Sequence, residues 1–371
     1  MKKKFIYILF IIFTSFFLVS CKSNVNEKRT YKADGTYMAW NLSSTSTTLL
    51  NADGVGAFNF KNGDTMTTKK VNTPVLTTVK VTIVNDKIIK YDVDEIASTA
   101  KVNYKKGTTD VNLDENGNPL SVTWVFDSKS KKQLEYEYNM GGTSGNQYGS
   151  CHEGGICKEW FLQISDLERF WLKSSPETYT IKTNDGITND ENIAGVTISV
   201  SLYEGLAKTA ISNAKNGYVS AIVPFEHYTY DVCFVNGKIN AEGKISDIKL
   251  NAQIFGNYVN GEVNSDAFTV GSENYLVFGW NNKDKYASYP EMSNGKTWQS
   301  MIDKVNEYIN NNGWDGSLTP GRVINEKLVN KGVTNNGKEI EVLSSVTIQL
   351  NNEVKVMNML LNFFPNGFKN E

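Results

Sequence analysis

Two threonines occupy matching places in a diverged internal repeat. Residues 196–217 and 346–367 align without a gap, from Val-Thr-Ile to Asn-Gly, so Thr197 and Thr347 correspond. Each threonine precedes an expected helix start, where free backbone N–H groups and the helix dipole favour an anion such as phosphate. On spacing alone, a local hydrogen-bonding or capping role is the commoner one for such a threonine. The chemistry these residues suggest is the binding of an anion such as phosphate.

The helix expected after Thr197 has clear boundaries. Ser201 to Glu204 has the S-x-x-E form of a capping box, and Asn216-Gly217 is typical of a helix end. In the second repeat Asn351 is the equivalent cap, and Pro365 predicts an irregular last turn. The first helix has an apolar stripe made of Tyr203, Leu206, Ala207, Ala210, Ile211 and Ala214.

Upstream of each threonine lies a second amphipathic segment, led by Trp160 in one repeat and Trp298 in the other. Both tryptophans stand on apolar stripes, which indicates core anchors rather than groups that stack on a ligand ring. Met140 and Met292 precede these segments and fit either the lining of a ligand pocket or gap filling under a loop. The stripes contain Trp160, Ile164, Leu167 and Trp171, then Trp298, Met301, Ile302, Val305 and Ile309.

Each repeat opens with β-type sequence. Residues 78–84 and 87–93 alternate about a turn at Asn85-Asp86, which predicts a hairpin. Residues 230–235, a turn at Asn236-Gly237 and 238–239 predict a shorter counterpart. The expected fold is α+β, with two tandem domains at 31–217 and 218–371, each an antiparallel sheet with packed helices.

The N-terminus predicts export and lipid anchoring. Three lysines precede fifteen mostly apolar residues, 5–19, too few to span a bilayer and typical of a signal peptide. Leu18-Val19-Ser20-Cys21 resembles a bacterial lipobox, which implies removal of 1–20 and acylation of Cys21. Residues 21–30 are then a polar tether. We therefore expect a protein held in the lipid bilayer of the cell membrane, on its extracytoplasmic face, either at a Gram-positive surface or in a periplasm.

Charge and cysteine usage exclude other classes. The 40 acidic and 38 basic residues favour no nucleic-acid partner. Cys151 and Cys157 bracket a Gly-rich loop, which favours a local disulfide over a metal site with His152, because the chain has only two histidines. Cys233 lies in an alternating apolar run and is expected to be buried. The sequence lacks the parts of a hydrolase triad or a metalloprotease motif, so no catalytic residue is assigned.

Asp34-Gly35-Thr36-Tyr37 and the order of the repeated elements resemble the FMN-binding domain family of exported bacterial lipoproteins, which includes tandem-repeat flavoproteins of extracellular electron transfer. The family pattern D-x-x-[ST]-G-A-[ST] marks where an FMN transferase esterifies FMN phosphate onto the last hydroxyl. Here the matching stretches are 191–197 and 341–347. The resemblance implies that Thr197 and Thr347 carry FMN, with Glu191, Gly195, Glu341 and Ser344 as the other motif positions.

Both motifs are degenerate. Glutamate replaces the aspartate, and Val196 and Val346 replace the small alanine, which predicts obstruction of the acceptor. Ser345 also replaces the glycine in the second motif, so Thr197 is the preferred acceptor. The resemblance implies a flavin-dependent electron carrier with a membrane redox partner, rather than an independent catalyst. The alternatives are a flavin-free binding or structural lipoprotein that keeps the scaffold, and a noncovalent binder of flavin or another small ligand.

Overall fold

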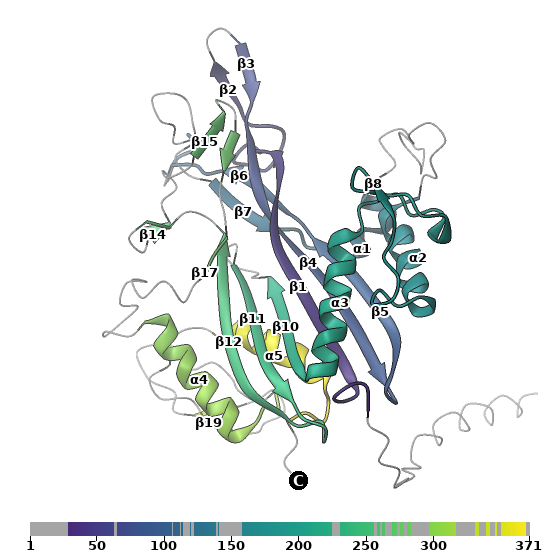
Figure 1. Ribbon diagram of the computed structural model, residues 1–371. Helices are drawn as coiled ribbons and strands as arrows, with labels where there is room; N and C mark the ends of the chain where they lie inside the picture. Colours follow the sequence, from purple (N-terminus) through teal and green to yellow (C-terminus); the bar gives the residue numbers. More distant parts are fainter. Residues whose placement is uncertain are drawn as a thin grey trace, which may run out of the picture. The chain divides into compact units, whose positions relative to one another are not determined.

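The computed structural model describes an α+β fold, as the sequence predicts (Figure 1). Tyr31–Glu371 form one compact unit. The boundary between two domains near residue 217 remains a prediction. The described residues are 29–62, 65–105, 107–111, 113, 119, 122–138, 140, 158–224, 231–255, 258–259, 262–263, 269–272, 275–277, 280–282, 297–316, 331–333, 339–341, 346 and 350–368.

The first half is built on three long antiparallel strands, β1 (Gly35–Thr48), β4 (Lys70–Val84) and β5 (Lys87–Ile96), with β4 in the middle. The predicted hairpin at Asn85-Asp86 is confirmed. Both residues have positive φ (51° and 59°), a backbone geometry that Asn and Asp tolerate in tight hairpin turns. The Asp34 carboxylate accepts hydrogen bonds from the N–H groups of Asn85 (2.7 Å) and Asp86 (3.2 Å), which ties the start of β1 to this turn.

Two helices cover this sheet. Helix α2 (Trp160–Lys173) packs on β5, and α3 (Ser201–Asn216) packs on β1 and β4 (Figure 1). The predicted apolar stripes of both helices are buried. Helix α3 ends at Gly217, whose φ of 75° is the left-handed geometry expected of a glycine after a helix.

The second half repeats this arrangement. Strands β10 (Tyr218–Pro224), β11 (Asp231–Ile239) and β12 (Ile245–Phe255) form the antiparallel sheet. Helix α4 (Trp298–Asn312) packs on β12, and α5 (Asn351–Phe363) packs on β10 and β11. The predicted stripe of α4 is buried at all five positions. Cys233 on β11 is fully buried, as expected.

The predicted turn at Asn236-Gly237 is wrong. These residues lie inside β11, where the register to β12 shifts, and the chain turns at 240–244 instead. A Cβ at Gly237 would lie 2.9 Å from Ile248 Cδ1 and 3.0 Å from the Ser246 carbonyl oxygen. The glycine therefore allows a close approach at a bulge rather than a hairpin turn.

The capping predictions also need correction. Helix α3 starts at Ser201, with Val200 as a cap that makes no side-chain hydrogen bond, and α5 starts at Asn351 with Leu350 in the same role. The buried Glu204 carboxylate instead accepts a hydrogen bond from the N–H of Ile181 at 3.1 Å. Helix α5 ends at Phe363, before Pro365, because the residue preceding a proline is disfavoured in a helix.

The two halves fasten their first helix to the sheet in the same way. Glu168 of α2 accepts a hydrogen bond from the N–H of Val93 on β5 at 2.7 Å. Asn306 of α4 accepts one from the N–H of Leu250 on β12 at 2.8 Å. Glu168 and Asn306 stand at the same distance from Trp160 and Trp298, the first residues of the two helices. Lys132 Nζ adds an ion pair to Glu168 at 2.6 Å, which helps to fix α2 in the first half.

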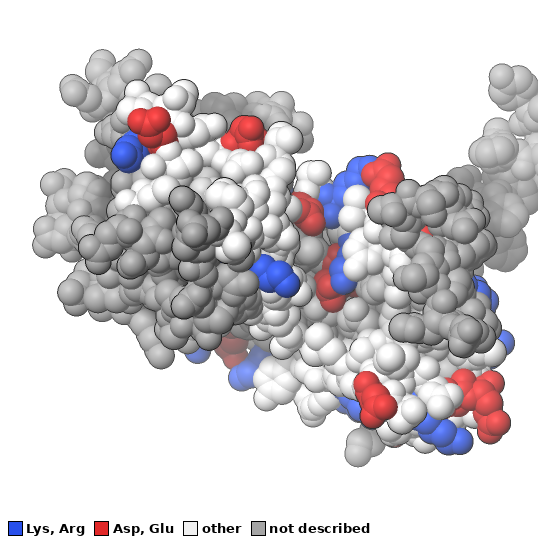
Figure 2. Space-filling model, turned by 90° about the horizontal axis from the view of Figure 1, so that it is seen from above, with Lys and Arg blue, Asp and Glu red and all other residues white. Residues whose placement is uncertain are grey.

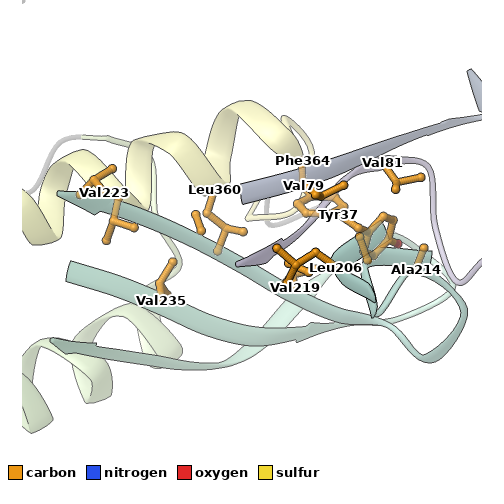
Figure 3. Packing of buried hydrophobic residues seen from close by; sticks show 14 of the residues in the cluster. Tyr37, Val79, Val81, Leu206, Ala214, Val219, Val223, Val235, Leu360 and Phe364 are labelled. Carbon is orange, nitrogen blue, oxygen red and sulfur yellow. The ribbon is translucent and has the colours of Figure 1, made fainter. Parts of the chain in front are cut away.

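One hydrophobic core joins the halves. Its buried side chains come from β1, β4, α2 and α3 and from β10–β12, α4 and α5. Figure 3 shows Phe364, at the end of α5, beside Tyr37 and Val79 of the first sheet. The Phe364 and Tyr37 rings meet edge to face with centroids 5.1 Å apart. The Met38 carbonyl oxygen accepts hydrogen bonds from Asn213 Nδ2 (3.1 Å) and Ser220 Oγ (3.0 Å), which joins β1, α3 and β10.

Shorter elements complete the described chain. Strand β16 pairs in parallel with β4, so the first sheet also receives a strand from the second half. Within the described residues, no helix has the length and apolar character needed to cross a membrane. The shorter elements are β2 (Asn59–Asn62), β3 (Thr65–Thr68), β6 (Ser98–Val102), β7 (Val122–Phe126), α1 (Lys131–Leu134), η1 (Glu135–Tyr138), β8 (Thr183–Asn184), β9 (Ile187–Thr188), η2 (Glu191–Ile193), β13 (Tyr258–Val259), β14 (Glu262–Val263), β15 (Thr269–Ser272), β16 (Tyr275–Val277), β17 (Trp280–Asn282), β18 (Lys331–Val333) and β19 (Glu339–Glu341).

Candidate functional site

The first candidate acceptor lies on a loop between β9 and α3, here called the acceptor loop (residues 189–200). Thr197 is half-buried three residues before the cap of α3. Gly195 is buried, with a φ of +92° that side-chain-bearing residues rarely adopt. Glu191 is exposed at the start of η2. The structure therefore places Gly195 in a tight turn two residues before Thr197 and leaves Glu191 at the surface of the loop.

Gln163 of α2 holds the acceptor loop. Its side chain is 1% exposed, and its Oε1 accepts hydrogen bonds from the backbone N–H of Thr197 (2.7 Å), the Thr197 hydroxyl (3.3 Å) and the N–H of Ile198 (3.2 Å). Its Nε2 donates to the Lys158 carbonyl oxygen at 2.8 Å. A buried amide with both ends bonded fixes the loop against α2. A polar residue on an otherwise apolar helix stripe was the sequence signal for this role, but its partner was not evident.

Asp190, not Glu191, is the carboxylate that organises the start of the loop. It is 7% exposed and accepts hydrogen bonds from the Tyr179 hydroxyl (2.8 Å) and from the N–H groups of Lys182 and Asn192 (3.0 Å each). Burial alone would raise the pKa of Asp190, but these donors outweigh it and lower the pKa to about 2. Asp190 directly precedes Glu191, the residue that aligns with the aspartate of the motif.

Val196 does not obstruct the acceptor. Its side chain is 3% exposed and belongs to the hydrophobic core, so the steric argument against Thr197 made from the sequence is wrong. Gly195 is the crowded position, because a Cβ there would lie 2.6 Å from Lys158 Nζ. Lys158 thus lies directly against the loop backbone, and its Nζ is paired with Asp166 at 2.7 Å.

A cavity of about 460 Å³ opens beside the acceptor loop. Three cationic side chains, Lys158, Arg169 and Lys173, line it together with the single carboxylate of Asp166. Asp166 pairs with both Lys158 and Arg169. Phe170 and Tyr179 add an aromatic wall, with ring centroids 5.2 Å apart. The cavity therefore combines an excess of positive charge with aromatic surface.

This excess is local. On the face shown in Figure 2, lysine and arginine side chains stand among aspartate and glutamate side chains, and the described residues form no extended patch of one sign. An extended basic surface of the kind that binds nucleic-acid backbones is therefore missing from the described part of that face.

The second candidate acceptor is described only in part. Glu341 ends β19, and Val346 is buried in the core like Val196. Ser344 and Thr347 lie outside the described residues. Helices α2 and α4 bury the same five positions counted from their first tryptophan, and Met301 occupies the position of Gln163. The second half thus lacks the amide that holds the acceptor loop in the first.

The other residues singled out from the sequence are described only in part. Cys21, Cys151, Cys157 and Met292 lie outside the described residues. Trp160 and Trp298 are buried core residues, as expected. Met140 is 44% exposed, and its Sδ lies 3.8 Å from Gln163 Nε2. Among the described residues, no three His, Cys, Asp or Glu side chains are grouped closely enough to hold a metal ion.

Comparisons with known proteins add little to this geometry. No protein-family model matches the chain. No curated protein matches it. The chain is similar to a protein from Clostridium thermocellum whose solution NMR structure is known, with 23% identity, 53% of this chain and 97% of that chain covered, and a TM-score of 0.22.

Proposed function

We propose that this protein is a lipid-anchored, extracytoplasmic electron carrier that holds FMN covalently on Thr197. The observation that carries the proposal is the acceptor loop itself. A half-buried threonine hydroxyl is held ahead of α3 by the buried Gln163. An earlier part of the same loop, Asn192 to Ala194, lines a cavity with three cationic side chains. This arrangement suits a phosphate ester, because helix N-termini and cations both stabilise phosphate charge.

The attachment step balances with FAD as the donor. The Thr197 oxygen forms a bond to the phosphorus of the FMN half, the phosphoanhydride bond of FAD breaks, AMP leaves, and the hydroxyl proton is released. An FMN transferase supplies the catalytic groups, and this chain supplies only the acceptor. The product is a phosphodiester with one negative charge, which matches the positive excess of Lys158, Arg169 and Lys173 over Asp166.

In this proposal the flavin supplies the electron chemistry, and the protein supplies position and electrostatics. Phe170 and Tyr179 provide aromatic surface next to the loop. The Tyr179 hydroxyl donates a hydrogen bond to Asp190, and this bond raises the pKa of the phenol. The proposed protein is anchored in the lipid bilayer and exchanges electrons with a membrane redox partner.

A flavin-free scaffold is the second candidate. The observation that favours it is the degenerate motif, in which Ala194 occupies the position of a hydroxyl residue and is exposed. In the second half neither the glycine nor the equivalent of Gln163 is kept. If the protein is a flavin-free scaffold, neither half carries FMN.

Intact-mass spectrometry after co-expression with an FMN transferase tests the proposal. We expect an FMN-sized adduct on the wild type that disappears chiefly in Thr197→Ala and persists in Thr347→Ala, with incomplete occupancy. A control protein with an intact D-x-x-S-G-A-T motif shows that the transferase is active. A fully modified control beside an unmodified wild type would overturn the proposal.

A repaired motif sharpens this test. Val196→Ala is a poor repair, because it would remove a core side chain at a cost of about 1 to 3 kcal/mol. Ala194→Ser changes an exposed position and restores the missing hydroxyl. We expect Ala194→Ser to raise occupancy at Thr197. If the repaired chain also stays unmodified, the flavin-free candidate replaces the carrier.

A further inference from the structure

Gln163 has a place in the site that the acceptor motif does not include. It stands 34 residues before Thr197, on helix α2 rather than on the acceptor loop, yet its Oε1 accepts hydrogen bonds from two consecutive backbone N–H groups and from the acceptor hydroxyl. Its other end is bonded to the Lys158 carbonyl oxygen. This second bond sets the orientation of the amide, with its oxygen toward the loop.

The direction of the hydroxyl bond has a chemical consequence. The Thr197 Oγ1 is the donor to Gln163 Oε1, because the same Gln163 oxygen accepts from the N–H of Thr197 and the amide hydrogens lie on Nε2. The hydroxyl hydrogen then points inward, toward a side chain that is 1% exposed. The lone pairs of Thr197 Oγ1 then point away from Gln163, where an electrophile can approach them.

The second half of the chain has a different residue at the position of Gln163. Helix α4 buries Met301 at the position of Gln163, and a thioether offers only a weak acceptor to backbone N–H groups. The two positions are equally buried, at 1% and 0% exposure, so the difference between them is chemical rather than one of packing.

We propose that Gln163 is a positioning residue for the attachment reaction, which fixes the Thr197 loop and turns its hydroxyl oxygen toward the incoming phosphorus. This inference rests on the proposed function. Gln163 touches neither the phosphorus nor the flavin, and it acts through the acceptor. Misplacement of a reacting atom by about 1 Å costs on the order of a hundredfold in rate, so the loss of this support is measurable.

The test compares Gln163→Met, which installs the residue of the second half, with Gln163→Glu, which keeps an acceptor oxygen. Gln299→Met on α4 is the matched control, since it makes the same change at a side chain bonded to Asp303 rather than to the acceptor loop. Two readouts are needed. One is hydrogen exchange at the amides of Thr197 and Ile198 in flavin-free protein, and the other is the initial rate of FMN attachment.

We expect Gln163→Met to speed exchange at both amides by about tenfold and to slow attachment by about tenfold to a hundredfold. Gln163→Glu should lie between the wild type and Gln163→Met in exchange rate and in attachment rate. Gln299→Met should change neither the exchange rate nor the attachment rate. Unchanged exchange in Gln163→Met, or equal attachment rates for Gln163→Met and the wild type, would overturn the positioning role alone. A wild type that takes up no FMN overturns the proposed function and this inference with it.

Discussion

Replacing Asp190 by asparagine tests whether this residue, and not Glu191, organises the acceptor loop. The carboxylate accepts from Tyr179 Oη, Lys182 N, Asn192 N and Asn192 Nδ2 at 2.8 to 3.1 Å. An asparagine has the same shape but turns one acceptor oxygen into a donor. That amide hydrogen then faces an N–H group, and the negative charge that strengthened the bonds is lost.

The expected magnitude follows from the pKa. Lowering the pKa of Asp190 from its usual 3.8 to about 2 corresponds to about 2 kcal/mol. Solvent at the loop surface screens part of this, so we expect Asp190→Asn to lower the free energy of unfolding by about 1 to 2 kcal/mol at pH 7. The matched control is Glu191→Gln, which removes the same charge from the exposed neighbour and should cost less than about 0.5 kcal/mol.

The pH dependence has a definite sign. The pKa of Asp190 is lower in the folded state than in the unfolded state, so its stabilisation is fully present above about pH 4 and is lost as the pH falls toward 2. Urea unfolding of the wild type and Asp190→Asn between pH 7 and pH 2.5 should show two curves that converge at the acid end. The reasoning is refuted if Glu191→Gln costs as much as Asp190→Asn, or if the difference between the curves does not shrink below pH 4.

Two further predictions concern the anchor and the core. Cys21→Ala should release the protein from membranes or leave its signal peptide uncut, which fractionation and intact mass will show; normal processing and acylation of the variant would contradict the lipobox assignment. Phe364→Ala should lower the free energy of unfolding by about 3 to 5 kcal/mol, because the ring joins α5 to Tyr37 of β1, and unfolding should remain a single transition. The control Leu172→Ala, at a 48% exposed site, should change the free energy of unfolding little. Two separate transitions would contradict a shared core.

Local patterns predicted the elements that depend on near neighbours. The Asn85-Asp86 hairpin followed from alternation on both sides of two residues that tolerate positive φ. The helix stripes followed from period, and their burial is confirmed at each predicted position. The α+β class followed from the mixture of these patterns.

The failures have long-range causes. Asn236-Gly237 resembles a hairpin turn, but Gly237 is required by the approach of Ser246 and Ile248. Ser201 to Glu204 resembles a capping box, but Glu204 bonds the N–H of Ile181, which lies 23 residues earlier. No local pattern contains either partner, so propensity and motif rules assign these residues to the commoner local role.

The candidate site was predictable only in its acceptor. Thr197 and Gly195 followed from the repeat and the motif, while the supports of the loop did not. Whether Val196 crowds the hydroxyl depends on which way its side chain turns, and only the core cluster settles that. The link from Gln163 to Thr197 requires knowing that α2 lies against the loop.

The two halves have kept the same scaffold positions and filled them for different purposes. In the gapless repeat Ala214 corresponds to Phe364, and both are buried, but the alanine allows close packing at the end of α3 while the phenylalanine reaches Tyr37 of the other half. Gln163 corresponds to Met301, so a hydrogen-bonded amide in α2 is replaced by an apolar side chain in α4. At both pairs the second half carries the larger or more apolar residue. At these two positions the second half contributes packing to a shared core, and at the position of Gln163 the first half makes the polar contacts that fasten a threonine loop to α2.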